Sequence, residues 1–399
     1  MLLDGMRIVS FCHFLQGPAA TQYLGDMGAE VIKIEPPQGA YERHWAGADR
    51  AKIGGVSAFF LSANRNARSL AIDLKHPKAK AVIYRLIANS HVVVENFRPG
   101  TLDRLGFGYA AVKAAKPDII YASASGFGAT GPYADRPGQD LLIQAMSGLV
   151  AATGGRAGPM AAGCAAADQH GGALLALGIL GAYAKWQRTG EGTLVEGNLL
   201  GAGVDLQTES LVTYYASGRG KEVFDRDAHL ATWFHEAPYG VYEIADGHMV
   251  LSLNAPDKLA TALKSQILRG FVGCNAYEER DAYAQAVATV LAPQRFADIA
   301  AQLDTQKLWF ARVEDFDDLR QNPQLLHNEM FREVPVNDAM VTLVNHPLRY
   351  DGAVPGFRGF ALQPGENTRA ILDENGLTTE EVEELLRDGA VFSPEVAAE

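Results

Sequence analysis

Short apolar runs alternate with a longer amphipathic run at the start of the chain, and this alternation constrains the fold more than any other feature. Residues 6–11 (MRIVSF) and 29–35 (AEVIKIE) have the length and the β-branched content of strands. Between them, residues 17–28 have a helical pattern that ends at Gly28. A strand, a helix and a second strand in succession form a βαβ unit, in which the two strands run parallel. The pattern therefore predicts a parallel sheet.

The same alternation continues through the first half of the chain. Strand-like runs at residues 91–95 and 118–121 each follow an amphipathic helical run, at residues 78–88 and 109–115 respectively. Strands that alternate with helices in this way are typical of an open, mostly parallel sheet with helices on its faces. We predict this Rossmann-like α/β architecture for a large domain.

The pattern changes after residue 200. Residues 240–252 predict a β-hairpin, because two short apolar runs flank the turn residues Asp246 and Gly247. Charged helical segments follow the hairpin. A mixture of strands and helices that no longer alternates predicts a second, smaller α/β domain.

The last segment returns to a regular pattern. Thr378 and Glu381 have the spacing of a capping box and predict the start of a terminal amphipathic helix. A chain of 399 residues is long enough for two or three domains, at roughly 100 to 200 residues each. We expect a large α/β domain made of residues 1–200 and 325–399, with residues 201–324 forming the small domain.

The charge and the absent motifs exclude several classes of protein. The formal net charge is -12, so the overall field repels polyanions, nucleic acid is not an expected partner, and an anionic ligand needs a local group of Lys and Arg. After the first predicted strand, residues 14–18 are FLQGP rather than GxGxxG, so NAD and FAD are not expected. P-loop, GxSxG and HExxH motifs are absent, and no histidines pair at metal-ligand spacing, so no metal site is predicted.

The cysteines and the apolar segments suggest a cytoplasmic protein. Cys12, Cys164 and Cys274 lie far apart and form no CxxC pair, which argues against a disulfide framework and a zinc site. The N-terminus lacks the basic region of a signal peptide. The longest apolar stretch, residues 171–184, is shorter than the ~20 residues of a membrane span and predicts a buried helix. We expect no membrane association.

Asp168 is a candidate for chemistry because of its position in the chain. It directly precedes an apolar helix expected from about Gln169, which predicts an N-cap position. The positive helix end is expected to keep the carboxylate ionised, and Gly171 and Gly172 are expected to leave room for a bulky acyl group. A purely structural cap explains the same position, because Asp is a preferred N-cap residue.

Motifs along the whole chain resemble those of the CaiB/BaiF family, the class III CoA-transferases. No single motif is specific, but their number and their order match the family. The matching segments are residues 28–35 (GAEVIKIE), 64–75 (NRNARSLAIDLK), 95–100 (ENFRPG), 102–107 (LDRLGF), 125–128 with 131–132, 167–168 with the helix after them, 189–192 (TGEG), 237–240 (APYG) with 246–247, and 364–368 (PGENT).

The resemblance implies a fold, an activity and a partner. Family members are interlocked homodimers with a large open α/β domain and a smaller one. They move CoA from an acyl-CoA donor to a small carboxylic acid, sometimes a dicarboxylate, between molecules or within one molecule. The resemblance implies acyl-CoA as a substrate, no tightly bound cofactor, and Asp168 as a nucleophile that forms a mixed anhydride and then an aspartyl-CoA thioester.

The resemblance also implies a CoA-binding set. Lys75, Asn96, Phe97, Arg98 and Arg104 match positions that surround the nucleotide part of CoA in the family. Arg suits phosphate because its planar fork donates two parallel hydrogen bonds, and Phe97 would contact adenine. A solvated surface charge explains Lys75 and Arg98 equally well.

Five further residues match the acyl end of the site. Gln139 and Asp140 match a segment beside the reacting acyl group, and Arg43, His44 and Trp45 match a loop near the acyl pocket. An arginine beside an aromatic ring is a candidate receptor for a substrate carboxylate. The alternative is that Arg43 is a surface residue and Trp45 a domain-contact aromatic.

The sequence departs from the formyl-CoA transferases of this family. Those enzymes have a glutamine one position before Gln16, a tyrosine at the position of Gln139, and a glycine-run loop in the small domain. This chain has residues 235–240 (HEAPYG) where such a run would be sought. Oxalate is therefore not expected as the acceptor. Gln16 remains a candidate site residue, although it is one position later than the glutamine of those enzymes.

Two other functions compete with CoA transfer. The related α-methylacyl-CoA racemases pair a histidine with the aspartate as two acid/base groups, but Gln139 does not titrate near neutral pH. His170 could take that place, although a packing role explains it as well. The third hypothesis is a CoA-binding protein without catalysis.

Overall fold

The computed structural model describes residues 1–45 and 51–394. The chain forms two compact units. The larger unit contains residues 1–143, 165–203 and the segment from Pro323 onward, and the smaller contains residues 144–164 and 204–322. Residues 144–164 were expected in the large domain and belong instead to the smaller unit.

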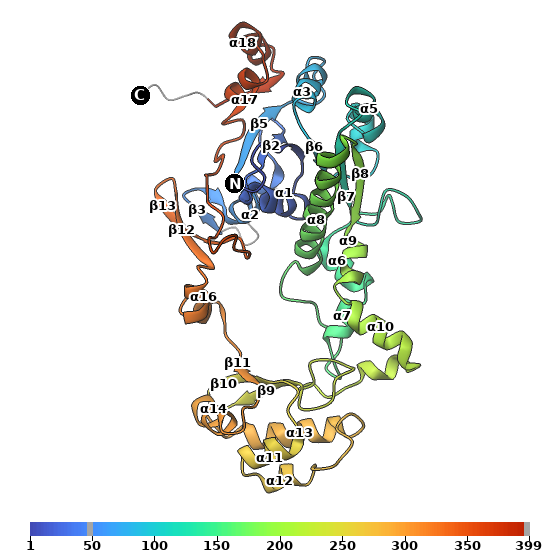
Figure 1. Ribbon diagram of the computed structural model, residues 1–399, viewed down its shortest axis with the longest axis vertical. Coiled ribbons are helices and arrows are strands. Elements are labelled where there is room, and N and C mark those ends of the chain that lie inside the picture. The colour runs from blue at the N-terminus through green and yellow to red at the C-terminus, as the bar shows by residue number, and fades with distance from the viewer. Residues whose placement is uncertain (46–50, 395–399) are drawn as a thin grey trace. The chain divides into compact units, whose positions relative to one another are not determined.

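A seven-stranded sheet with the order β14-β5-β2-β1-β6-β7-β8 forms the centre of the larger unit (Figure 1). Its strands are β1 (Arg7–Phe11), β2 (Glu30–Glu35), β5 (Ala67–Ile72), β6 (Val92–Glu95), β7 (Ile120–Ser125), β8 (Thr193–Asn198) and β14 (Val391–Phe392). All neighbours in this sheet pair in parallel except β14, which is antiparallel to β5. The predicted mostly parallel α/β sheet is confirmed.

Side chains that alternate along each strand bury both faces of the sheet. On β1, Ile8 contributes to the cluster under α1 (Gln16–Asp26) and α8 (Ala166–Thr189), while Val9 contributes to the cluster on the opposite face. Helices on that opposite face are α3 (Ala79–Ala88), α5 (Tyr109–Ala115), α17 (Thr368–Glu374) and α18 (Thr379–Arg387).

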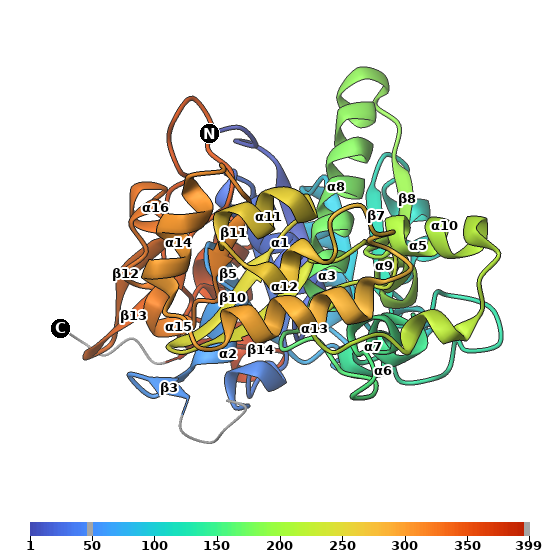
Figure 2. The ribbon, with the colours of Figure 1, turned by 90° about the horizontal axis from the view of Figure 1, so that it is seen from below.

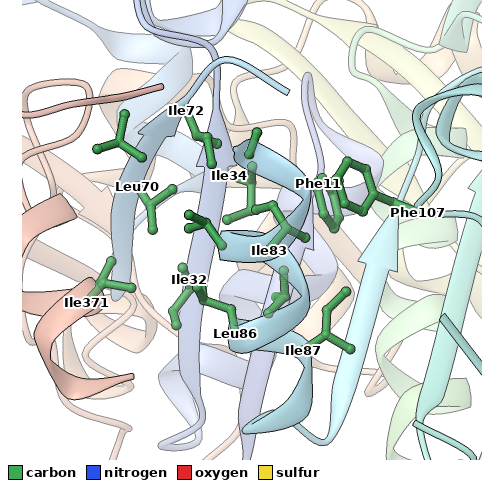
Figure 3. Close-up of a cluster of buried hydrophobic side chains, with 14 of the residues drawn as sticks. Phe11, Ile32, Ile34, Leu70, Ile72, Ile83, Leu86, Ile87, Phe107 and Ile371 are labelled. Atoms are coloured by element: carbon green, nitrogen blue, oxygen red, sulfur yellow. The ribbon is translucent and has the colours of Figure 1, made fainter. Parts of the chain in front are cut away.

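Figure 3 shows part of this opposite face, where Ile83, Leu86 and Ile87 of α3 lie over strand side chains such as Ile32 and Leu70. Each of these five residues is fully buried.

The smaller unit has its own core around a three-stranded antiparallel sheet. Strands β9 (Gly240–Ile244), β10 (Gly247–Leu251) and β11 (Phe310–Arg312) form it, and the β9–β10 pairing confirms the predicted hairpin. Figure 2 shows α11 (Pro256–Ala262), α12 (Gln266–Arg269) and α13 (Arg280–Leu291) beside one another. Together with α14 (Phe296–Asp304), these helices cover the core.

The remaining elements are short. They are η1 (Tyr41–Arg43), β3 (Lys52–Ile53), β4 (Val56–Ser57), α2 (Ala58–Ala63), α4 (Thr101–Leu105), α6 (Asp140–Met146), α7 (Leu149–Thr153), α9 (Leu199–Asp205), α10 (Thr208–Ser217), η2 (Lys221–Phe224), α15 (Phe316–Leu319), α16 (Pro323–His327), β12 (Phe331–Val336) and β13 (Ala339–Val344). Thr378 and Glu381 form the predicted capping box at the start of α18. Within residues 1–45 and 51–394, none of the helices combines the length and the apolar character that a membrane crossing requires.

A buried ion pair joins α1 to the later part of the larger unit. The carboxylate of Asp26 accepts two hydrogen bonds from Arg65, at 2.9 and 2.6 Å, and a third from Asn66. Arg65 also donates to the carbonyl of Val344 on β13. Burial alone would raise the pKa of Asp26, but hydrogen bonds from His346 and Arg65 outweigh burial and hold this pKa below its usual range.

We predict that Asp26→Asn lowers the free energy of unfolding by about 3–5 kcal/mol, because it leaves the Arg65 guanidinium buried without a countercharge. The change is measured as the urea midpoint at neutral pH. Glu374→Gln removes one partner of the more exposed Arg68–Glu374 pair and should cost less than about 1 kcal/mol. Equal losses in the two variants would contradict the prediction.

Candidate functional site

The order of the strands creates a topological switch point at one edge of the sheet. From β1 the chain adds β2 and β5 on one side, then crosses to add β6, β7 and β8 on the other side. In open α/β sheets, ligands bind outside the carboxyl ends of the strands at such a reversal. Here residues 12–16, which follow β1, and residues 96–98, which follow β6, lie at this point. We call these two segments together the switch-point crevice.

The topology brings the sequence-predicted residues to this carboxyl edge. Gln16 follows β1, and the loop with Arg43, His44 and Trp45 follows β2. Lys75 follows β5. Asn96, Phe97 and Arg98 follow β6, and Arg104 lies on α4 just beyond. Gln139 and Asp140 lie in the connection that follows β7, and Asp168 lies at the start of α8, which leads into β8.

Asp168 lies within the first turn of α8 and not at its N-cap. The helix begins at Ala166, so the predicted start near Gln169 is three residues late. The capping groups come instead from Asp140, whose Oδ1 accepts the N–H groups of Ala167 at 2.8 Å and of Asp168 at 3.1 Å. A carboxylate from a distant part of the chain therefore satisfies this helix end.

The pKa of Asp168 is shifted upward. Burial is the main cause, the nearby charge of Asp140 adds to it, and together they raise the pKa to about 7. This corrects the expectation that the helix end keeps the carboxylate fully ionised. At neutral pH the group can gain or lose a proton, and its ionised form is more basic than an ordinary carboxylate.

Gly171 and Gly172 allow α1 to approach α8. A Cβ atom at Gly171 would lie 2.9 Å from Nε2 of Gln16, and one at Gly172 would lie 2.9 Å from the Gln16 carbonyl oxygen. The glycines therefore serve helix packing, which corrects the expectation that they leave room for an acyl group. Because Gly171 lies about one helical turn after Asp168, the buried amide of Gln16 lies close to the start of α8.

His13, which no sequence motif identified, joins the two sides of the crevice. Its N–H donates to Oδ1 of Asn96 at 2.9 Å, and Nδ2 of Asn96 donates to the His13 carbonyl at 2.8 Å. The imidazole packs against the ring of Phe97, with centroids 4.8 Å apart. Burial lowers the pKa of His13, which favours the neutral ring. Its position directly after the first strand is the signal that could have identified it.

Three predicted phosphate-binding cations are exposed. Lys75, Arg98 and Arg104 have no ion pair with a carboxylate in the described part of the chain, and Arg104 donates to Oγ1 of Thr101 at 3.2 Å. Their charges are open to solvent.

Arg43 is not available as a receptor for a substrate carboxylate. Its guanidinium donates to both carboxylate oxygens of Glu35, at 2.7 and 2.6 Å, and to the carbonyls of Ala361 and Leu362, both at 3.0 Å. It also lies over the ring of Phe60. The whole fork is occupied, which corrects the expectation of a carboxylate receptor.

The neighbours of Arg43 and the predicted Gln139 are exposed. Nε2 of His44 lies 2.8 Å from the carbonyl of Gln38, and the Trp45 ring packs edge-on against Phe59. Gln139 lies directly before α6. Residues 1–45 and 51–394 contain no cluster of three or more His, Cys, Asp or Glu side chains that could hold a metal ion.

The family model described as CoA-transferase family III matches residues 3–366. The chain belongs to this CoA-transferase family. A CaiB/BaiF family protein from Brucella suis has a similar structure, with a TM-score of 0.81 and 28% identity, over 94% of this chain and 99% of that one. This CoA-transferase is therefore an enzyme with the CaiB/BaiF fold.

Two relatives that are named for an activity match most of this chain. A succinyl-CoA:glutarate CoA-transferase from Mus musculus is 30% identical over 93% of this chain and 86% of its own. A succinyl-CoA:mesaconate CoA-transferase from Haloarcula hispanica is 31% identical over 94% of this chain and 97% of its own. Both names describe transfer of CoA between small carboxylic acids.

We predict that Asp168→Asn stabilises the CoA-transferase at pH 8 but not at pH 4. A carboxyl with a raised pKa favours folding only in its neutral form. Its contribution is complete below the unfolded pKa near 3.8 and is lost as pH rises through about 7. Asn stays neutral, so the gain at pH 8 should be on the order of a few kcal/mol in urea unfolding.

A matched control removes an exposed carboxylate five residues before Asp140. Asp135→Asn, in the loop before α6, should change the free energy of unfolding by less than about 0.5 kcal/mol at both pH values. An Asp168→Asn gain of the same size at pH 4 and pH 8 would contradict the assigned cause.

Proposed function

We propose that the protein transfers CoA from an acyl-CoA donor to a small carboxylic acid, with Asp168 as the nucleophile. The single observation that supports this most directly is a half-buried carboxyl on the first turn of α8, with a pKa raised to about 7, at the carboxyl edge of the sheet. A carboxylate that must attack a thioester benefits from this raised basicity.

The reaction consists of acyl transfers at Asp168. Its carboxylate attacks the thioester carbonyl of the donor and forms a new C–O bond. The C–S bond breaks, CoA leaves as a thiolate, and a mixed anhydride of Asp168 and the donor acyl group remains. The thiolate then attacks the aspartyl carbonyl and releases the donor acid as a carboxylate, which leaves an aspartyl-CoA thioester. The acceptor carboxylate then attacks the aspartyl-CoA thioester, which gives a second mixed anhydride and releases the CoA thiolate. The thiolate attacks the acceptor carbonyl of this anhydride, so the acceptor leaves as its CoA thioester and the Asp168 carboxylate is regenerated.

Two neighbours of Asp168 have distinct proposed roles. Asp140 fixes the start of α8 through two N–H groups and raises the basicity of the nucleophile. Because Asp140 occupies these N–H groups, they are not free to stabilise an oxyanion. The amide of Gln16 makes no hydrogen bond within the described residues and is the proposed donor to the tetrahedral intermediates.

The CoA nucleotide is proposed to bind at the switch-point crevice. Lys75, Arg98 and Arg104 would attract its phosphates, and the half-buried ring of Phe97 would pack against adenine. Asn96 would act through the crevice backbone, since its amide is hydrogen-bonded to His13.

The acceptor class follows from the relatives. Their names point to donors such as succinyl-CoA and to dicarboxylate acceptors, so we propose a small mono- or dicarboxylic acid for this chain. Arg43 is excluded as the receptor, which leaves exposed groups such as His44 and Trp45 for the acyl end.

A cytoplasmic homodimer is part of the proposal. The CaiB/BaiF resemblance implies this assembly, and exposed apolar side chains on the larger unit are consistent with a partner surface. Leu177 on α8 is 64% exposed, and Leu141 on α6 is 57% exposed.

The decisive experiment traps the covalent intermediate. The protein is incubated with hydroxylamine and a panel of acyl-CoAs that begins with succinyl-CoA, and its peptides are analysed by mass spectrometry. We predict a hydroxamate on Asp168, because hydroxylamine attacks an activated aspartyl carbonyl, and none in Asp168→Ala. Asp140→Asn keeps the nucleophile and should still give the adduct.

The raised pKa of Asp168 would also suit proton transfer in an acyl-CoA racemase. That activity would appear as exchange of the α-hydrogen of a 2-methylacyl-CoA in heavy water without an aspartyl hydroxamate. This result would replace the transferase proposal.

We predict that kcat/KM rises with pH and levels off above about 7, because the ionised form of Asp168 is the nucleophile and kcat/KM follows the free enzyme. In Asp140→Asn the rise should move to lower pH, because the neighbouring negative charge is gone while the amide oxygen can still cap α8. An unchanged profile would show that another group controls the rate.

A further inference from the structure

Another buried ion pair lies beside the crevice and has no role in the chemistry described so far. Nζ of Lys33, on β2, lies 2.7 Å from Oε1 of Glu42, on η1. The side chains are 5% and 0% exposed. Removing two charges from water is costly, and an apolar pair of similar size would fill the same space. The other groups that Lys33 and Glu42 bind therefore indicate what the charges do.

Both residues also bind the backbone of the switch-point crevice. Nζ of Lys33 donates to the carbonyl of Cys12 at 2.9 Å. Oε2 of Glu42 accepts the N–H of Phe14 at 3.3 Å. The ion pair therefore holds the residues on either side of His13, while Asn96 holds His13 itself from the β6 side.

These backbone groups have no partner in the sheet. The pairing of β1 with β2 ends at Ser10 and Lys33, and the pairing with β6 ends at Phe11 and Glu95. The chain then turns to enter α1. Buried polar groups beyond the last rung of a ladder need other partners, and Lys33 and Glu42 supply them.

The turn that they hold is strained. Phe14 has φ of 58°, in the left-handed region that bulky side chains rarely adopt. Strained backbone persists only where its surroundings enforce it, and it occurs often at binding sites. Gln16 begins α1 two residues later, so the geometry of this turn also sets where the Gln16 amide lies.

A neighbouring ion pair provides a natural comparison. Glu35 and Arg43 come from the same two elements, and their side chains are 0% and 5% exposed. Their further hydrogen bonds go to Ser69, to the N–H of Ala40 directly before η1, and to the carbonyls of Ala361 and Leu362. None goes to residues 12–16 or 96–98. The two pairs match in burial and differ in the backbone that they hold.

We propose that Lys33 and Glu42 are positioning residues that hold residues 12–14 in the conformation that binds CoA. They act through the crevice backbone and do not touch the reacting atoms. The inference rests on the proposed function, because it assigns CoA to this crevice.

The test compares three variants of the full chain. Glu42→Gln keeps the shape but offers one acceptor oxygen where the carboxylate uses two. Lys33→Met with Glu42→Met removes both charges together and should stay folded even if the single variant does not. Glu35→Gln damages the control pair. Thermal unfolding of each variant reports the loss of stability.

Hydrogen exchange of peptides that contain residues 12–16 reports the turn, and calorimetry with CoA reports binding. In Glu42→Gln and in the double variant we expect faster exchange in these peptides and a Kd for CoA raised by about tenfold or more, because the crevice is no longer preorganised. In Glu35→Gln we expect lower thermal stability, unchanged exchange in these peptides, and a Kd within about twofold of wild type.

Unchanged exchange of residues 12–16 in the Lys33 and Glu42 variants would overturn the proposal. Faster exchange without a change in Kd would overturn it as well, and so would equal effects on Kd in Glu35→Gln. If the unaltered protein binds neither CoA nor an acyl-CoA, the proposed function fails. The hydrogen-exchange data alone would then decide whether Lys33 and Glu42 fix the conformation of residues 12–14.

Discussion

Parallel pairing of β1 with β2 on one side and with β6 on the other determines where the functional groups lie. The carboxyl ends of parallel strands lie at the same edge of the sheet. Later strands are added first on one side of β1 and then on the other, so the segments that follow β1 and β6 diverge at this edge. The helix that leads into β8 must begin at the same edge, which brings Asp168 to it. One topological fact therefore gathers residues that are more than 150 positions apart in the sequence.

At this edge the polar backbone groups that the strands leave unpaired become the main energetic problem. Asp140 caps the buried start of α8, and Glu95 accepts the N–H of Phe97 at 2.8 Å. Each solution uses a carboxylate, and each carboxylate alters its surroundings. The charge of Asp140 raises the pKa of Asp168, so the group that stabilises the helix also makes the nucleophile more basic. Structural and chemical roles are difficult to separate here because one charge has both.

Local pattern was sufficient to predict much of the fold and only part of the site. Strand alternation located β1, β2 and the β9–β10 hairpin, and the Thr378 capping box lies where its spacing predicted. These features depend on neighbours within a few residues. The cap on α8 comes from Asp140, 28 positions before Asp168, and the fork of Arg43 is occupied by Glu35 across two elements. Such pairings depend on tertiary contacts that sequence spacing does not encode.

The charged residues of β2 also show that tertiary contacts, which the sequence pattern does not reveal, decide whether a side chain is buried. Lys33 and Glu35 are two positions apart, so both side chains lie on the same face of β2. Two charged side chains on one face of a strand suggest a face exposed to water. Both are buried, because η1 returns over them with Glu42 and Arg43 in the complementary order of charge. Two apolar pairs could bury the same area, but they could not supply a donor for the Cys12 carbonyl or an acceptor for the Phe14 N–H. Charge is therefore retained where the sheet ends and the backbone still needs partners, which is also where an open α/β sheet binds its ligand.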